Sequence, residues 1–425
     1  MNDALNACHL VFRHWLGAEY DLDALDAVLA VAATEQLGGD PPWLLVVSGS
    51  GNAKTETVGA LAGIGAFVTS TIASEGALLS ASSKKEQAKD ATGGLLRRIG
   101  ERGLLVVKDF TSIISMSRDA RASVLAALRE VYDGKWERNV GTDGGRTLTW
   151  EGRIVMVGAV TTAYDSAHAV ISSMGDRFAL VRVDSGAGAS RLAAGRQALA
   201  NVNQEVQMRT ELTGAVSVLM DRLAPELAVL TDEDMDTLLR VADLVTLART
   251  AVERDYRGDV IEAHAPEMPT RFAKMLGQII RGGLAIGMER DHALAVAVRV
   301  AGDSMPPLRF LILQDVADHP GSRTTDVRKR LQRPHNTVDR ELQALHVLGL
   351  LQQNDAERQG WLYSLTDVVD PQTLKLIAVS RFGCMHTRGT TEVEQEVCVQ
   401  VQPNLETAQA TLGTPPALLA AEEIS

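Results

Sequence analysis

The sequence has little cysteine, no long apolar run and few aromatic residues. Its three cysteines, Cys8, Cys384 and Cys398, match neither a disulfide framework nor the spacing of a metal site. Such sparse thiols are typical of a reducing compartment. No apolar run approaches the roughly 20 residues that cross a bilayer, and the N-terminus lacks the pattern of a signal peptide. We therefore expect a cytoplasmic protein that makes no membrane contact.

The chain also lacks an excess of positive charge. Its formal net charge is −12 and its pI is about 5.3, which argues against a surface that is basic throughout. A local basic patch could still bind nucleic acid. The 45% hydrophobic and 23% charged residues are ordinary for a soluble globular protein. A length of 425 residues suggests two or three domains.

Apolar segments alternate with helical segments through the first half of the chain. Most of these segments are short, nearly continuous apolar runs and one is rich in β-branched residues, so they predict an α/β fold with a parallel sheet covered by helices on both faces. A further segment, 136–153, has two β-like arms around a glycine-rich turn and predicts an inserted hairpin. The five predicted strands lie in LLVV (44–47), GAFVTSTIAS (65–74), GLLVV (103–107), RIVMVGAV (153–160) and FALVRV (178–183).

Two segments predict domain boundaries. The small residues of DSGAGAS (184–190) separate the sheet-forming part from a region with a helical pattern, and Pro306-Pro307 introduces a third unit. We expect a core with an N-terminal helical segment over 1–190, a helical region over 191–304 and a third unit over 305–370. The tail 371–425 is expected to be acidic and partly disordered.

The segment SGSGNAKT follows an apolar strand and precedes a helix. It nearly matches the nucleotide-binding pattern G-x-x-x-x-G-K-[ST], although Ser48 and Ala53 stand at the two glycine positions. In such a loop, backbone N–H groups bind phosphates, the lysine adds charge and the Thr hydroxyl ligates Mg²⁺. The alternative is a chance Gly-Ser-Gly turn before a helix. The predicted ATP-binding residues are Ser48, Gly49, Ser50, Gly51, Asn52, Ala53, Lys54 and Thr55.

A carboxylate on a neighbouring strand is the second feature of a Mg²⁺-ATP site. GLLVVKDF supplies Asp109, just past an apolar strand. ATPases of this type usually carry Asp-Glu there, so two registers are open. Asp109 is either the metal carboxylate, with Phe110 in place of the base, or the base, with Lys108 in place of the metal ligand. One carboxylate is missing in both registers, which favours ATP binding over fast hydrolysis. The alternative role of Asp109 is a helix N-cap.

Two further polar residues follow in the expected order. Thr161 ends the fourth strand in MVGAVTT, where a polar side chain would face the γ-phosphate, with Thr162 as a substitute. Arg177 precedes the fifth strand in MGDRFALVRVD. An arginine at that place in oligomeric ATPases stabilises transition-state charge on the neighbour's γ-phosphate. The alternative is a surface arginine paired with Asp176.

In this order and spacing, SGSGNAKT, the strand before Asp109, GAVTT and GDRF resemble the core of AAA+ ATPases over roughly residues 20–300. The resemblance implies a helical lid with a second arginine that senses the γ-phosphate. Arg271 in PTRFAKMLGQIIRG fits that role. It also implies ATP bound between subunits of a homo-oligomer, with Lys54, Thr55 and Asp109 from one copy and Arg177 from the next.

The predicted hairpin 136–153 is similar to the pre-sensor hairpin of the AAA+ branch that holds minichromosome-maintenance helicases and MoxR-type ATPases. In helicases of that branch the hairpin lines the ring pore and touches DNA. Lys135, Arg138 and Arg146 could serve that role here. The alternative is an ordinary solvated loop.

Residues 308–365 predict three helices and a small hairpin and resemble a winged helix-turn-helix domain. The third helix is predicted over about His335 to Gly349, with Asn336 able to cap it and Asp339 three residues on as in a capping box. Such a helix enters the major groove with its N-terminal residues at the base edges. From Pro320 to Leu345 there are six Lys/Arg and three Asp/Glu. The alternative is a protein contact. The predicted DNA-binding residues are His335, Asn336, Thr337 and Arg340 for bases, Arg328, Lys329 and Arg330 for phosphates, and Arg358 in the wing.

Together these features predict an ATP-dependent DNA-binding AAA+ protein of replication, a mobile element or a phage. It would act as an initiator, a helicase loader or a helicase-like ATPase. An AAA+ core before a winged helix also resembles archaeal origin-recognition initiators. The alternative is a non-hydrolysing, ATP-gated winged-helix transcriptional regulator. A MoxR-like remodelling chaperone would leave the winged helix unexplained.

Overall fold

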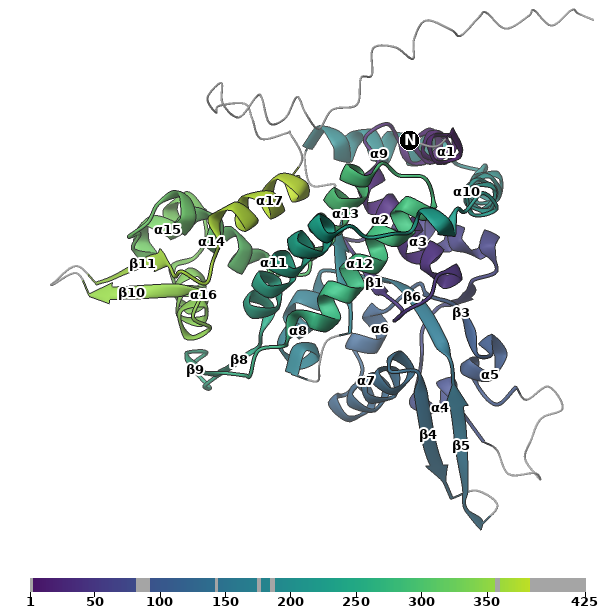
Figure 1. Cartoon of the computed structure of the whole chain (residues 1–425), viewed down its shortest axis with the longest axis horizontal. Helices are drawn as coiled ribbons and strands as arrows, with labels where there is room; N and C mark the ends of the chain where they lie inside the picture. Colours follow the sequence, from purple (N-terminus) through teal and green to yellow (C-terminus); the bar gives the residue numbers. More distant parts are fainter. Residues whose placement is uncertain are drawn as a thin grey trace, which may run out of the picture. The chain divides into compact units, whose positions relative to one another are not determined.

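A five-stranded parallel sheet organises the first half of the chain (Figure 1). Each predicted strand segment overlaps one of its strands, so the predicted parallel α/β sheet is confirmed. The strand order is β2-β3-β6-β1-β7, and every pairing is parallel. The strands are β1 (Trp43–Val47), β2 (Phe67–Thr69), β3 (Arg102–Val107), β6 (Arg153–Val160) and β7 (Ala179–Arg182).

The computed structural model describes residues 3–81, 92–141, 144–173, 177–183, 188–355 and 360–382. Contacts join Met1–Arg381 in one compact unit, so the boundaries at 190, 304 and 370 stay predictions. The helices before residue 180 are α1 (Asp3–Leu16), α2 (Leu22–Ala33), η1 (Thr34–Gln36), α3 (Lys54–Gly59), η2 (Ala60–Ile64), α4 (Glu75–Leu78), α5 (Leu95–Ile99), α6 (Thr111–Ile114), α7 (Arg118–Tyr132) and α8 (Ala163–Ser173).

Within the described ranges, no helix is both long enough and apolar enough to cross a bilayer.

The central strands form the core because their side chains are covered on both faces. All five residues of β1 are buried, as are all residues of β6 after Arg153. Helix α2 contacts β1, β6 and β7, while α12 and α13 pack on α2. Trp43 packs against Tyr132 of α7, with ring centroids 5.2 Å apart. This two-sided burial explains why β1, and β6 after Arg153, are apolar without alternation.

The hairpin predicted within 136–153 is confirmed as β4 (Lys135–Val140) paired antiparallel with β5 (Arg146–Glu151). Trp136 lies opposite Trp150 at its base, and both side chains are buried. The Trp150 Nε1–H donates to the Gly100 carbonyl at 2.8 Å. The hairpin is therefore anchored by aromatic burial at one end, next to β6.

The region predicted as helical contains five helices and one hairpin that the sequence did not predict. Strands β8 (Val252–Arg254) and β9 (Val260–Ala263) pair antiparallel between α11 and α12. The helices are α9 (Gly188–Ala200), α10 (Glu205–Met220), α11 (Asp232–Arg249), α12 (Pro269–Ala285) and α13 (Arg290–Asp303), with a short η4 (Pro225–Leu227).

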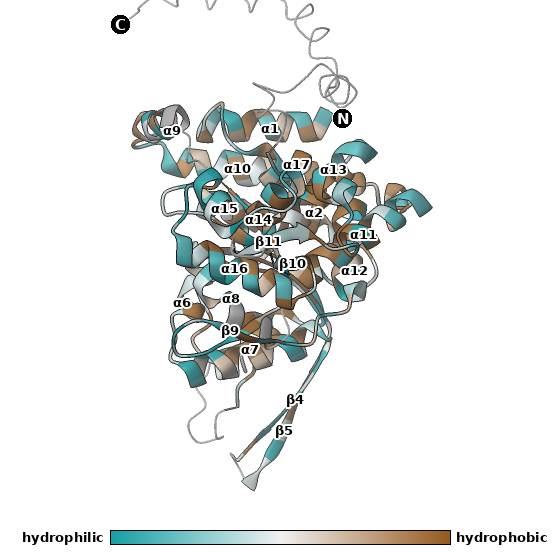
Figure 2. Ribbon diagram, turned by 90° about the vertical axis from the view of Figure 1, so that its left-hand side faces the viewer, coloured by the Kyte–Doolittle hydropathy of each residue, from teal (hydrophilic) through white to brown (hydrophobic). Residues whose placement is uncertain are grey.

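The third predicted unit has three helices followed by an antiparallel hairpin, as expected. Figure 2 shows hydrophilic residues predominating on α15. The predicted N-cap at Asn336 is wrong, because α16 begins at His335 after Pro334, whose ring fixes a φ suited to the chain entering a helix. The elements are α14 (Pro307–Asp318), α15 (Thr324–Arg330), α16 (His335–Val347), β10 (Leu351–Asp355) and β11 (Trp361–Leu365).

The first twelve residues of the predicted tail form helix α17 (Pro371–Phe382). Its Ile377 packs against Gly302 of α13, where an added Cβ would approach the Ile377 Cγ2 to 2.5 Å. The Arg381 Nε lies 2.8 Å from the Asp303 carboxylate. The folded chain therefore extends past the predicted boundary at 370.

Candidate functional site

The segment Ser48–Thr55 connects the carboxyl end of β1 to α3. The Ser48 N–H donates to the Val160 carbonyl of β6 at 3.2 Å. In this loop the Lys54 Nζ donates to the carbonyls of Ser48 at 3.1 Å and Gly49 at 2.8 Å. The ammonium group therefore folds back over the loop, while the side chain of Thr55 is exposed.

The loop has left-handed backbone at Gly51 (φ +87°) and at Ala53 (φ +52°). The Ala53 carbonyl accepts hydrogen bonds from the N–H and the hydroxyl of Thr57, at 2.9 and 3.0 Å. Ala53 thus occupies the N-cap position of α3 in a conformation that costs an L-residue roughly 1 kcal/mol. The second glycine of the nucleotide-binding pattern corresponds to this position.

Asp109 follows β3 at the same edge of the sheet and is exposed. The N-cap of α6 is Phe110 rather than Asp109. The Phe110 ring is fully buried against Phe178, with centroids 5.1 Å apart, so it does not face an open site. Burial lowers the pKa of Lys54, and the charge of Asp109 opposes that shift. Asp109 is therefore electrostatically coupled to the lysine of the loop.

Thr161 follows β6, directly beside the start of the loop, because Val160 pairs with Val47. Its N–H donates to the Thr111 Oγ1 at 3.0 Å, and its hydroxyl accepts from that group at 3.4 Å. The Ala163 N–H lies 3.4 Å from the same hydroxyl. The structure therefore brings together the loop, Asp109 and Thr161 at the carboxyl edge of the sheet.

Arg177 lies at the opposite edge, because it precedes β7 and β7 runs parallel to β1. Its Nη2 lies 3.4 Å from the Asp133 carboxylate, and its guanidinium is 5.5 Å from the centroid of the Tyr132 ring. The predicted partner Asp176 is outside the described residues. Since β1 spans five residues at about 3.3 Å each, roughly 16 Å of sheet separate the two edges.

Arg271 also lies at this amino edge. Its Nη1 donates to Glu267 at 3.2 Å, and the other oxygen of Glu267 accepts from Arg249 at 2.5 Å. Burial raises the pKa of Tyr132 to about 12, while the charges of Arg271 and Arg177 oppose that shift. The structure therefore places Arg271 beside Arg177 and does not bring it to Lys54, which the expected lid role requires within one copy.

The first turn of α16 presents the predicted base-contacting residues His335, Asn336 and Thr337 in exposed positions. Lys329 at the end of α15 is also exposed, and Arg328 is half-buried. Arg333, which was not among the predicted contacts, is exposed and lies two residues before the start of α16. Exposed polar and basic side chains therefore cluster at the N-terminal end of α16.

Two other residues predicted to contact DNA are bonded to groups within the chain. Arg330 forms a bidentate ion pair with Asp315, with both distances 2.7 Å, and this ties α15 to α14. Arg340 donates to the Arg257 carbonyl in the β8–β9 turn. The predicted wing residue Arg358 lies outside the described residues.

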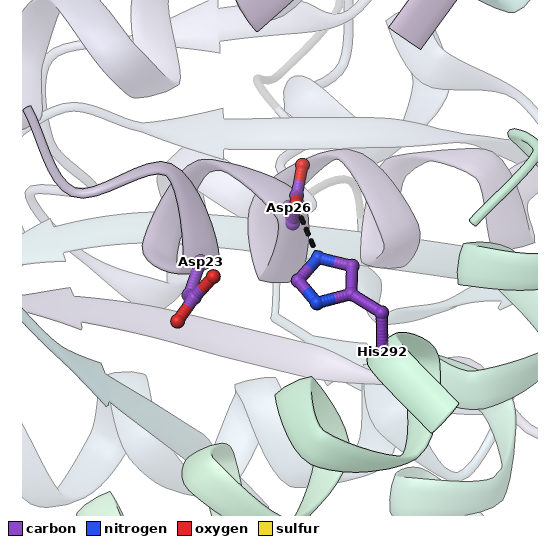
Figure 3. A group of neighbouring side chains, drawn as sticks. All are labelled: Asp23, Asp26 and His292. Atoms are coloured by element: carbon purple, nitrogen blue, oxygen red, sulfur yellow. Dashed lines mark hydrogen bonds and ion pairs between the residues drawn. The ribbon is translucent and has the colours of Figure 1, made fainter. Parts of the chain in front are cut away.

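One group of side chains in the described part of the chain has the composition of a metal site. A carboxylate oxygen from each of Asp23 and Asp26 and a nitrogen of His292 lie within 4.8 Å of one another (Figure 3). Asp26 already accepts hydrogen bonds from His9 at 2.6 Å and from His292 at 2.7 Å. The Arg299 guanidinium lies 3.6 Å from Asp23. Hydrogen bonds from the two histidines and the nearby Arg299 guanidinium already engage the two carboxylates, and these contacts link α1, α2 and α13.

No family model matches this sequence, and no curated protein matches it. The interpretation of the site therefore depends on the geometry described above.

Proposed function

We propose that this chain is an ATP-dependent DNA-binding protein of the AAA+ class that acts as a homo-oligomer. The observation that carries the proposal is the sheet order β2-β3-β6-β1-β7 with the Ser48–Thr55 loop after β1. Ligands of open α/β sheets bind beyond the carboxyl ends of the strands, at the point where the strand order reverses. Here that point lies at β1, which is flanked by β6 and β7, and Asp109 and Thr161 follow two nearby strands.

The loop is suited to the phosphates of ATP. Lys54 would exchange its bonds to the Ser48 and Gly49 carbonyls for bonds to β- and γ-phosphate oxygens. The exposed hydroxyl of Thr55 and the carboxylate of Asp109 are oxygen ligands of the kind that Mg²⁺ prefers. Bound Mg²⁺ would neutralise phosphate charge. Thr161, already oriented by Thr111, would present its hydroxyl beside the loop.

The positions of Arg177 and Arg271 support ATP binding between copies. Neither arginine can reach Lys54 of its own chain across roughly 16 Å of sheet. A neighbouring copy that set its amino edge against this carboxyl edge would deliver both cations to the phosphates. Arg177 and Arg271 are each held by a carboxylate here, Asp133 and Glu267. Phosphate oxygens would replace those carboxylates.

The third unit supports DNA binding through a winged helix-turn-helix. Three helices followed by a hairpin, with the polar first turn of α16 exposed, fit the placement of a recognition helix in the major groove. Lys329 and Arg333 flank that turn and would contact phosphates. The hairpin β4–β5 offers exposed Lys135 and Arg146 as a second contact. Its third basic residue, Arg138, is bound to Glu75 at 2.7 Å.

A specific observation favours the second candidate, a non-hydrolysing ATP-gated winged-helix regulator. Because Phe110 is buried, Lys108 and Asp109 are the residues after β3 that remain to face the nucleotide. A single carboxylate would have to serve both the metal and the attacking water. The same nucleotide site would then act as a switch and not as a motor.

ATP turnover with and without duplex DNA separates the two candidates. We expect Lys54→Ala to abolish ATP binding, and Asp109→Asn to abolish turnover while leaving binding measurable. Lys375→Ala and Asp119→Asn, which change exposed residues outside the site, are the matched controls. The motor would be supported if DNA stimulates ATP turnover and both site variants abolish it. We place such a motor in replication or in a mobile element or phage. Binding without turnover would support the regulator. No ATP binding would overturn both.

A further inference from the structure

The β8–β9 hairpin ends in an ordered turn that no part of the proposed site uses. The Asp255 carboxylate accepts the N–H groups of Arg257 at 2.8 Å and Asp259 at 2.9 Å. The Asp255 N–H donates to the Asp259 carbonyl at 2.9 Å, and Arg254 donates to the Gly258 carbonyl at 3.2 Å. These bonds fix the conformation of the turn.

Helix α16 holds this turn in place. Arg340 donates to the Arg257 carbonyl, and its guanidinium lies against Gly258, where an added Cβ would come within 2.7 Å of the Arg340 Cζ. Gly258 also has a φ of +87°, a conformation that L-residues rarely adopt, so a side chain there would be strained. Glu341, the next residue of α16, accepts from Arg254 at 2.7 Å. Two consecutive residues of α16 thus position the hairpin.

The face of α16 that holds the turn is the face proposed to meet DNA. Arg340 lies four residues after Asn336 and three after Thr337, and residues at these spacings share one side of a helix. Contacts place β9 against α16, and Figures 1 and 2 both draw the two elements next to each other. Nucleic acid bound at the first turn of α16 would therefore pass close to the tip of the hairpin.

The tip carries an exposed aromatic ring backed by a cation. Tyr256 is 89% exposed. The Arg257 guanidinium lies 5.2 Å from the centroid of the Tyr256 ring, and its Nε donates to the Tyr256 hydroxyl at 2.8 Å. The two arginines and two aspartates of 254–259 cancel in charge. This combination suits stacking on a base, for which an aromatic ring and an arginine are the usual platform, better than binding phosphates.

We propose that Tyr256 stacks on an unpaired base of DNA whose adjacent duplex is bound by the first turn of α16. This inference rests on the proposed DNA-binding function and adds the form of DNA preferred, a junction between duplex and single strand. The hairpin supplies the contact to the single strand. Arg340 and Glu341 act as positioning residues that fix the distance between the two contacts.

The test measures the affinity of the full chain for a short duplex and for the same duplex with single-stranded arms, by fluorescence anisotropy. The forked DNA carries 2-aminopurine at unpaired positions beside the junction, since stacking quenches its emission. We expect wild type to bind the fork more tightly and to quench the probe. Tyr256→Ala should weaken fork binding about tenfold and leave duplex binding within about twofold.

Tyr256→Phe, which keeps the ring, should bind and quench like wild type. Ile261→Ala, at an exposed position of β9 in the same hairpin, should change neither affinity. Equal losses on duplex and fork in Tyr256→Ala would overturn the inference, as would no loss. Tighter binding by that variant would mean that the tip obstructs DNA, and would also overturn it. If wild type binds neither DNA, the proposed function fails as well, so the two failures are distinguishable.

Discussion

The two edges of the central sheet differ in how their charges are held. At the carboxyl edge, Lys54 bonds to backbone carbonyls of its own loop and Asp109 is exposed. At the amino edge, Arg177 and Arg271 are bound to the carboxylates of Asp133 and Glu267. One edge carries the Ser48–Thr55 loop with Lys54 bonded to its carbonyls, and the other carries two arginines paired with carboxylates. This difference underlies the proposal that neighbouring copies would each supply one half of a shared site.

The largest expected effect on ATP turnover comes from replacing Arg177 at the amino edge. We expect Arg177→Ala to lower ATP turnover about 1,000-fold, because the cation that stabilises transition-state charge is lost, while ATP affinity stays unchanged. Mixing this variant with Lys54→Ala should restore part of the turnover, since some contacts between copies then join two intact halves. Arg118→Ala, at an exposed position on α7, is the control.

Mixed samples as inactive as the separate variants would show that the arginine does not act between copies. Because Arg177 is largely buried against Tyr132, thermal unfolding of each variant distinguishes lost chemistry from lost stability. Arg177→Lys retains the charge and should keep more turnover than Arg177→Ala.

Replacing Arg271 tests whether the second arginine of the amino edge also contributes to ATP turnover. We expect Arg271→Ala to lower turnover about 100-fold, the effect typical of removing one donor to developing charge. The affinity of a dilute, monomeric sample for ATP should not change, because Arg271 lies far from Lys54. Equilibrium binding of a fluorescent ATP analogue measures this. Weaker binding by the monomer would place Arg271 at the loop of its own chain and contradict the structure.

A buried ion pair behind the carboxyl edge should control stability and its pH dependence. Burial opposes the charge of Asp26, but hydrogen bonds from His292 and His9 outweigh it, so the pKa of Asp26 is lowered. Burial also disfavours protonated His292, but the bond to Asp26 and its charge raise the pKa of His292. We expect Asp26→Asn to cost about 3 kcal/mol in the free energy of unfolding, measured by urea denaturation.

The pH range of this stabilisation follows from the directions of the two shifts. The raised pKa of His292 gives stability that is complete below the unfolded value of 6.5 and is lost as pH rises through the folded pKa. The lowered pKa of Asp26 gives stability present above 3.8 that is lost as pH falls through the folded pKa. The difference between wild type and His292→Ala should be largest near about pH 5. A difference that does not vary with pH would contradict the ion pair.

The smallest expected effect is a gain in the free energy of unfolding from a substitution in the Ser48–Thr55 loop. Ala53→Gly should relieve the left-handed backbone at φ +52° and raise the free energy of unfolding by about 0.5 kcal/mol, net of the entropy that glycine adds to the unfolded chain. ATP affinity should stay the same or increase. Ala60→Gly, in a right-handed turn nearby, should be destabilising and serves as the control. Destabilisation by Ala53→Gly would mean that the loop is not strained.

The sequence predicted the sheet well because the residue pattern of each strand by itself indicates a strand. In buried parallel strands such as β1, and β6 after Arg153, every residue is apolar, and this pattern does not depend on what packs on them. The hairpin β8–β9 was missed because its strands are short and largely exposed. Its turn depends on the Asp255 carboxylate and on Arg340 and Glu341, which lie about 80 residues further along the chain.

The candidate site was predicted only in part, because some of its features also depend on contacts between residues far apart in the chain. The Ser48–Thr55 loop, Asp109 and Thr161 were each predicted at or just past the end of a strand, and the structure sets all three at the carboxyl edge of the sheet. The role expected of Arg271 depended on where α12 packs, and the bonds of Lys274 and Gln278 to Asp40, just before β1, set α12 at the amino edge. Arg330 and Arg340 were predicted to contact DNA, but Arg330 is paired with Asp315 and Arg340 is bonded to the β8–β9 turn.

The sequence by itself determined the strands, the loop after β1 and the basic stretch from Pro320 to Leu345, because local patterns of burial and charge encode them. The tertiary structure decided which arginines are engaged, which edge each one occupies, and that Tyr256 lies beside α16. These facts depend on contacts between residues far apart in the chain. A charged side chain finds its partner only after the apolar core has fixed the elements that carry both groups.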